Sequence, residues 1–219
     1  MIQTKLSVHG NAQKIRAARF SPQCSVLGPG KRGVLWVQGC ERHCPGCTAP
    51  ETWDPEGGSE VSTDFLAEYF TSKKELEGLT FSGGEPMLQA EALTELMEAC
   101  RRKRPDFTFM AYSGFTLEEL MAEADPSRLE MLARLDLLID GPYLEEAHEN
   151  LLWRGSRNQR VWFLTKRYEA EWGPKIFSAG VQLELEVEQD SIHCMGIPPK
   201  NFRRDFEEIV RSLLKEEKD

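Results

Sequence analysis

Long apolar runs are absent from the sequence, which has no stretch of about 18 consecutive apolar residues that could span a bilayer. Residues 1–30 also lack the apolar core of a secretory signal peptide. We therefore expect a cytoplasmic protein without a membrane partner. Positive charge is scarce as well, because 27 Lys and Arg against 36 Asp and Glu give a net charge of −9. Such a chain would repel a phosphate backbone, so direct nucleic-acid binding is not expected.

The cysteines suit a metal centre better than a set of disulfides. Cys40, Cys44 and Cys47 form a CxxxCxxC array directly after the apolar run 33–39. The chain is far larger than the small secreted domains that depend on disulfides, and three of its thiols are crowded into this short array. Three thiolates can hold three irons of a 4Fe-4S cluster and leave the fourth iron open to a ligand. The array therefore predicts a reactive metal centre.

Zinc is the alternative metal for the same cysteines. A structural zinc site usually takes four ligands in two separated pairs, and the sequence shows no second pair of this kind. His43 inside the array, or Cys24 or Cys194 from a distance, could still complete a zinc site. Cys100 lies in a helical pattern and is expected to be a small core residue.

One domain is expected for a chain of 219 residues, of which 40% are hydrophobic. Strands are predicted over residues 34–37, 78–81, 107–112, 135–140, 161–165 and 181–187. Helices are predicted after a cap at Ser62 or Thr63, over 88–97, after the capping box Thr116–Glu119 and over 127–134. Alternating strands and helices imply right-handed βαβ units, so the fold class is α/β with a parallel sheet.

The end of the chain is predicted to add two further elements. Residues 181–187 alternate apolar and polar side chains, as a half-exposed edge strand of the sheet would. Apolar residues between 202 and 214 recur at helical spacing behind Asn201, which predicts a helix that packs on the sheet. About six strands fall short of a closed eight-stranded barrel.

A glycine-rich turn follows the second predicted strand. Gly83 and Gly84 would let the backbone approach a ligand closely, and Glu85 adds a carboxylate at the same place. The carboxyl ends of successive parallel strands lie on one face, which brings residues 82–85 beside the cysteine loop. A carboxylate beside a cluster could hold the ammonium group of a ligand. Taken alone, the turn would be explained by a helix start with an N-terminal acid.

The cysteine array followed by the turn Ser82–Pro86 resembles the radical S-adenosylmethionine (SAM) superfamily. The blocks at 36–47, 111–120, 140–143 and 153–160 resemble the activating proteins of anaerobic ribonucleotide reductase and of related glycyl-radical enzymes. This resemblance covers residues from about 30 to about 165. It implies the superfamily's partial, open parallel β/α barrel, here with an added C-terminal helix.

The resemblance also implies an activity and its residues. The cluster ligands would be Cys40, Cys44 and Cys47. The candidate contacts of SAM would be Gly46, Gly83, Gly84, Glu85, Ser113 and Asp140. One electron from the cluster would cleave SAM, and the resulting 5′-deoxyadenosyl radical would take an α-hydrogen from a glycine of a glycyl-radical enzyme such as the class III reductase. The expected reductant is flavodoxin or ferredoxin.

Two extensions depart from the resemblance. The single domain 1–219 would consist of a core at about 30–165, an N-terminal extension 1–29 and a C-terminal extension 166–219. The extensions could alter the substrate, so a radical SAM enzyme that acts on another protein, a peptide or a small molecule is one alternative. A non-catalytic, metal-stabilised binding module is the other. Residues 193–199 could lie over the open face of the site, although a surface connection before the last helix is the simpler interpretation.

Overall fold

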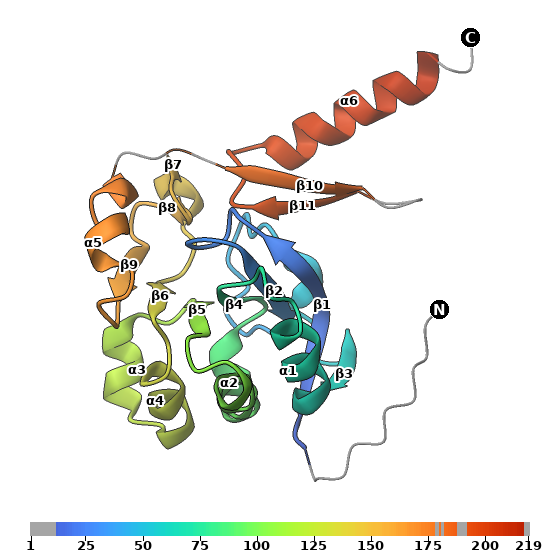
Figure 1. The fold of residues 1–219 in the computed structure, drawn as a ribbon. Coiled ribbons are helices and arrows are strands. Elements are labelled where there is room, and N and C mark those ends of the chain that lie inside the picture. The colour runs from blue at the N-terminus through green and yellow to red at the C-terminus, as the bar shows by residue number, and fades with distance from the viewer. Residues whose placement is uncertain (1–11, 178–179, 181, 188–191, 217–219) are drawn as a thin grey trace.

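A single seven-stranded sheet forms the centre of the computed structural model, which describes residues 12–177, 180, 182–187 and 192–216 (Figure 1). In spatial order its strands are β3 Ser59–Ser62, β1 Lys14–Cys24, β2 Arg32–Val37, β4 Gly78–Gly83, β5 Thr108–Tyr112, β6 Leu137–Asp140 and β9 Arg160–Phe163. The neighbours among β2, β4, β5 and β6 run parallel, whereas β1, β3 and β9 pair antiparallel. The α/β class is confirmed, with a mostly parallel centre.

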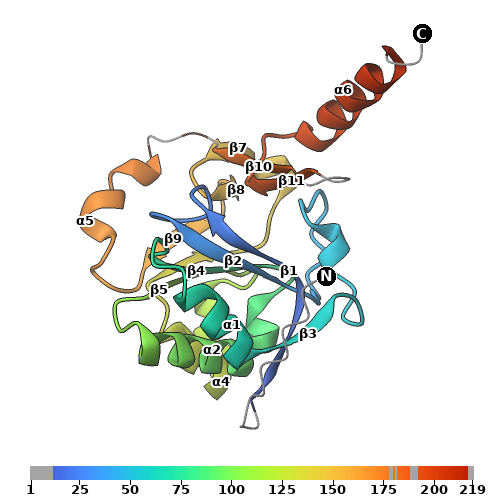
Figure 2. The same cartoon turned by 45° about the vertical axis from the view of Figure 1, so that its right-hand side comes forward.

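Helices cover one face of this sheet (Figures 1 and 2). They are α1 Thr63–Thr71, α2 Ala90–Lys103, α3 Leu117–Glu123 and α4 Pro126–Leu132. The Ser62 hydroxyl accepts a hydrogen bond from the Phe65 amide at 3.1 Å, and Thr116 and Glu119 form a capping box. Both predicted helix starts are therefore confirmed. Short helical segments follow at η1 Pro50–Thr52, η2 Pro86–Gln89, η3 Glu145–Ala147, α5 Glu169–Trp172 and η4 Lys175–Phe177.

Two hairpins cover the opposite face. They are β7 His148–Leu151 with β8 Arg154–Ser156, and β10 Leu183–Val187 with β11 Ile192–Gly196. Because successive residues of a strand point to opposite faces, Leu35 and Leu138 pack beneath the helices, whereas Val34 and Ile139 pack on the hairpin side. The helices and the two hairpins therefore lie on opposite faces of the central strands.

Several predictions about the edges of the sheet were wrong. The predicted strand 181–187 does not join the main sheet, because β10 pairs only with β11 among the described strands. The strand predicted at 161–165 is confirmed as β9, but it runs antiparallel to β6, whereas the predicted sheet was parallel. Helix α6 Phe202–Glu216 does not pack on the sheet and instead extends beyond the β10–β11 hairpin (Figures 1 and 2). Alternation in a strand shows that one face is covered, but not which sheet it joins.

A buried arginine joins the three central strands. Arg32 begins β2 and is 1% exposed. Its guanidinium donates to the Thr80 and Thr108 hydroxyls, both at 2.9 Å, and to the Leu79 carbonyl at 2.6 Å. Burial lowers the pKa of Arg32 from its ordinary value, and these oxygen acceptors offset the lost hydration of its charge. The side chain thus links β2, β4 and β5 away from their carboxyl ends.

Replacing Arg32 by alanine is expected to lower the free energy of unfolding by about 3–5 kcal/mol, because it leaves a cavity and buried oxygens without donors. Arg157→Ala is the matched control, since the Arg157 side chain is 70% exposed and its variant should change stability by less than about 0.5 kcal/mol. Denaturant unfolding measures both values. Equal stability of the two variants would contradict the structural role of Arg32.

Candidate active site

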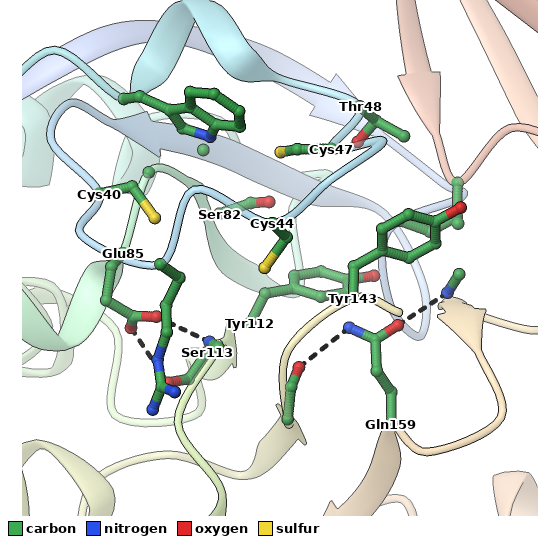
Figure 3. Close-up of a pocket in the computed structure, with 18 of the residues that line it drawn as sticks. Cys40, Cys44, Cys47, Thr48, Ser82, Glu85, Tyr112, Ser113, Tyr143 and Gln159 are labelled. Carbon is green, nitrogen blue, oxygen red and sulfur yellow. Dashed lines mark hydrogen bonds between the residues drawn. The ribbon is translucent and has the colours of Figure 1, made fainter. Parts of the chain in front are cut away.

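A pocket opens at the carboxyl ends of β2, β4, β5 and β6 (Figure 3). The cysteine loop follows β2, Glu85 follows β4, Ser113 follows β5 and Gly141 follows β6. The space between protein atoms there is about 850 Å³, including the open mouth. This size is typical of a small-molecule site, and ligands of open α/β sheets bind at this edge.

The three cysteines of the array line this pocket together. Cys40, Cys44 and Cys47 are all free thiols, and Figure 3 shows them on one side of the pocket. The Cys40 amide donates to the Trp53 carbonyl at 3.1 Å, and the Cys47 amide donates to the Cys44 carbonyl at 3.1 Å. These backbone bonds fold the loop so that thiols from three positions face the same space.

The arrangement of the thiols fits an iron–sulfur cluster. Within the described parts of the chain, no group of three or more His, Cys, Asp or Glu side chains is close enough together to hold one metal ion. Three free thiols that line one pocket are nevertheless the soft donor set that an iron–sulfur cluster takes, because each thiolate can bind a different iron. Burial raises the pKa of the Cys40 and Cys47 thiols, but a coordinated metal deprotonates its thiol ligands.

Two glycines let the turn after β4 pack against the cysteine loop. Gly83 has a φ of 93°, which favours glycine, and a Cβ there would lie 2.6 Å from the Val37 carbonyl oxygen. A Cβ on Gly84 would collide with the Gly39 carbonyl. The Gly84 amide donates to the Val37 carbonyl and the Glu85 amide to the Gly39 carbonyl, both at 2.8 Å. The glycines therefore serve this backbone contact besides any contact with a ligand.

Glu85 is held between two loops with its carboxylate in the pocket. The residue is 2% exposed. Its Oε1 accepts from the Met87 amide and the Ser113 hydroxyl, both at 3.0 Å, and its Oε2 accepts from the Gly114 amide at 2.7 Å. Burial raises the pKa of Glu85, and these hydrogen bonds oppose the rise. Each carboxylate oxygen can accept two bonds, so Oε2 retains capacity for a ligand donor.

The other candidate contacts occupy different positions. Ser113 lines the pocket, whereas Asp140 and Gly46 are not among its lining residues. The Asp140 carboxylate instead accepts from the Leu117 amide at 2.7 Å and from the Arg160 Nε at 3.0 Å. Gly46 has a φ of 74°. Contact of SAM with Gly46 or with Asp140 stays a prediction.

Sequence reasoning missed Tyr143, His148 and Gln159, which line the side of the pocket next to the β7–β8 hairpin, called the far side below. Tyr143 Oη and His148 Nδ1 are 3.0 Å apart, and Gln159 donates to the Gly141 carbonyl at 3.2 Å and accepts from the Gly155 amide at 2.9 Å (Figure 3). Tyr143 and Gln159 lie in the sequence blocks that carried the resemblance, so those blocks were the available signal. His148 gave none, because the β7–β8 hairpin alone brings it to the site.

Trp53 lies against the cysteine loop. It lines the pocket, and its ring stacks on His43 with centroids 4.8 Å apart. Burial raises the pKa of the Cys47 thiol, while a hydrogen bond from the Trp53 side chain and one from the Ala49 amide oppose the rise. Donors to cluster sulfurs stabilise the more negative, reduced state and so raise the reduction potential.

Trp53→Phe is therefore expected to lower the midpoint potential of the reconstituted cluster by about 40 mV. A shift of this size corresponds to the loss of one hydrogen bond that stabilises the reduced cluster by ~1 kcal/mol more than the oxidised cluster. A redox titration followed by electron paramagnetic resonance measures the potential. Trp172→Phe is the control, because Trp172 packs on Trp153 away from the cysteines. The same potential in both variants would disprove the contribution of the indole donor.

Comparison with known proteins finds one matching family model and several relatives that share the same name. A family model described as "4Fe-4S single cluster domain" matches residues 26–162. The chain is 34% identical over 148 residues to the anaerobic ribonucleoside-triphosphate reductase-activating protein of Enterobacteria phage T4, with 66% of this chain and 91% of the relative aligned. The protein of the same name from Vibrio cholerae is 34% identical over 150 residues, with 65% of this chain and 94% of the relative aligned. That of Escherichia coli K12 is 28% identical over 150 residues, with 65% of this chain and 95% of the relative aligned.

The matched region contains the parts of the site that the sequence singled out. The cysteine array, the turn 82–85 and Ser113 all fall within residues 26–162, whereas β10, β11 and α6 lie outside. None of the helices in the described residues is long and apolar enough to cross a membrane. With more than half of the chain matched, this protein belongs to the 4Fe-4S single cluster domain family, together with the anaerobic ribonucleoside-triphosphate reductase-activating proteins.

Proposed function

We propose that this protein is a radical SAM enzyme that activates a glycyl-radical enzyme, and that this target is an anaerobic ribonucleotide reductase. The observation that carries the proposal is the convergence of Cys40, Cys44 and Cys47 with the buried Glu85 in one pocket. The bound 4Fe-4S cluster would supply the electron that cleaves SAM to methionine and a 5′-deoxyadenosyl radical. The names of the relatives, anaerobic ribonucleoside-triphosphate reductase-activating proteins, support the reductase as the class of target.

In this proposal the chain binds and orients SAM around a fixed carboxylate. Glu85 Oε2 would accept a hydrogen bond from the methionine ammonium group, beside the backbone of Gly83 and Gly84. Ser113 would position this carboxylate through its bond to Oε1. The hairpins and the cysteine loop would limit water around the radical.

Two further candidates take indirect roles. The buried Asp140 would hold the end of β6 through the Leu117 amide and Arg160, so that its neighbour Gly141 borders the pocket. Gly46 would let the cysteine loop turn close to Tyr143, because a Cβ there would lie 3.1 Å from that ring. Both assignments make these residues supports for bound SAM.

The architecture and the setting belong to the same proposal. We take the sheet as a partial, open β/α barrel, since four parallel strands converge on the pocket and Arg32 joins three of them away from it. One domain would span the chain, with the catalytic core at about 30–165. The reductant would be flavodoxin or ferredoxin, in the cytoplasm.

An activation assay tests the proposal. The protein, reconstituted anaerobically with iron and sulfide and then reduced, is mixed with SAM and the anaerobic reductase of its own host. We expect 5′-deoxyadenosine together with a glycyl radical signal on the reductase. A protein with an intact cluster that makes no 5′-deoxyadenosine would contradict the enzymatic activity.

A second candidate function keeps the chemistry and changes the target. About a third of the chain lies outside its alignments with the named relatives. The match to the family model ends at residue 162, and the pocket borders Ile197 and Pro198, which lie beyond it. The target would then be another protein, a peptide or a small molecule. Production of 5′-deoxyadenosine without a glycyl radical on the reductase would favour this candidate.

A further inference from the structure

We propose that the C-terminal extension forms one wall of the active site, and that Ile197 and Pro198 contact the hydrogen-donating segment of the substrate protein rather than SAM. These two residues are called the C-terminal wall below. The inference rests on the proposed function and assigns a role to the far side of the same pocket. It assigns this side of the pocket to a segment of the substrate protein's chain.

The C-terminal wall reaches across the pocket to the β7–β8 hairpin. Ile197 and Pro198 both line the pocket. A Cβ placed on Gly155 would lie 3.5 Å from Ile197 Cγ2 and 3.1 Å from the Tyr143 ring. Ile197 also packs with Tyr112 against the apolar cluster beneath the β10–β11 hairpin. The wall therefore closes the side of the pocket where Tyr143 and Tyr112 lie.

The β10–β11 hairpin holds the wall in place. Met195, two residues before Ile197, is 5% exposed and packs in the same cluster as Cys24 and Leu27. Glu184 accepts a hydrogen bond from the Ser25 amide at 3.1 Å. The burial of Met195 contributes most of this anchoring, because partly exposed polar contacts contribute little. The wall is thus attached to β1 and its following loop, not only to the chain around it.

The far side of the pocket offers hydrogen bonds that the described residues leave unused. Tyr112 Oη and His148 Nε2 are buried and have no hydrogen-bond partner within the described part of the chain, and both residues line the pocket. A peptide segment brings one N–H and one C=O per residue and could satisfy both atoms. The apolar side chains of the wall would cover such a segment without competing for its polar groups.

The division of the pocket follows from chemistry. The charged amino and carboxylate groups of SAM need charged or backbone partners, and Glu85 and the glycine turn supply these beside the cysteines. The wall is apolar and lies beyond residue 162, where the family model ends. Binding of SAM is required of every enzyme with this chemistry, whereas the target can differ between proteins. A wall outside the matched region therefore suits contact with the target.

The test compares two single alanine substitutions, one in the C-terminal wall and one in the β10–β11 hairpin that holds it. Ile197→Ala removes part of the wall. Val187→Ala is the matched control, because Val187 lies in the β10–β11 hairpin that directly precedes the wall, is 71% exposed and does not line the pocket. Activation of the host reductase gives the KM for the reductase, and 5′-deoxyadenosine production gives the KM for SAM. For Ile197→Ala we expect the KM for the reductase to rise about tenfold more than the KM for SAM. Val187→Ala should match the wild type in both.

Cluster content and thermal melting establish whether each variant folds, and Ile197→Val provides a milder change with a smaller shift in the same direction. Equal rises in the two KM values would place Ile197 against SAM and overturn the inference. Wild-type KM values in Ile197→Ala would overturn it as well, while leaving the proposed function intact. A wild-type protein that cleaves SAM but activates no reductase would instead overturn the proposed function, and the inference with it.

Discussion

Alanine in place of Cys40, Cys44 or Cys47 is expected to abolish SAM cleavage in each single variant. The three thiols line one pocket, and each would bind a different iron, so the loss of one thiolate leaves an iron without its protein ligand. Iron and acid-labile sulfide per chain, measured after anaerobic reconstitution, should fall with the activity. The 5′-deoxyadenosine formed should drop to the level of protein without iron.

Cys100→Ala is the matched control for these variants. Cys100 is fully buried in α2 within the main apolar core and does not line the pocket. Its loss should remove about 1 kcal/mol of stability through a small cavity and leave the iron content unchanged. A Cys100 variant without a cluster, or a Cys44 variant that kept full activity, would show that the ligands are misassigned.

Glu85→Gln is expected to weaken SAM binding by about 2 kcal/mol, or roughly 30-fold in Kd, because a neutral amide replaces the carboxylate opposite an ammonium group. The NH2 group of the glutamine would also face donors that now bind a carboxylate oxygen, either the Gly114 amide or the Met87 amide with the Ser113 hydroxyl. Isothermal titration of the reconstituted protein with SAM measures the Kd, and thermal melting separates the loss of affinity from a loss of stability.

Glu41→Gln provides the comparison for that change. Glu41 is exposed in the cysteine loop and does not line the pocket, so its variant alters the charge of the same loop without touching the proposed SAM site. It should bind SAM as the wild type does. If Glu85→Gln and Glu41→Gln bound SAM equally well, the role of Glu85 would have to be abandoned.

The near side of the site could be predicted from the sequence because its signals are local. The spacing of Cys40, Cys44 and Cys47, the strand before them and the turn through Glu85 all lie in short segments. The rule that parallel strands end on one face was enough to bring them together. The prediction for Gly83 was incomplete, since its missing side chain also makes room for the backbone of the cysteine loop.

The far side could not be predicted because it depends on contacts between distant segments. His148 reaches the pocket through the β7–β8 hairpin, and Ile197 reaches it because Met195 packs beside Cys24. No local pattern encodes either contact. Residues 193–199 were interpreted mainly as a surface connection, whereas part of this segment borders the pocket. The strands β1 and β3 were missed for a related reason, since much of each is polar, and their pairing depends on distant segments: β3 is an edge strand that pairs with β1, and β1 pairs with β2.

Transfer of deuterium tests the central claim most directly. The host reductase is produced with deuterium at the α-carbon of glycine and is incubated with the reduced protein and unlabelled SAM. If the 5′-deoxyadenosyl radical takes a glycine α-hydrogen, mass spectrometry should find one deuterium in the 5′-deoxyadenosine, together with a glycyl radical on the reductase. Unlabelled 5′-deoxyadenosine would contradict the account, because the radical would then take its hydrogen from another donor.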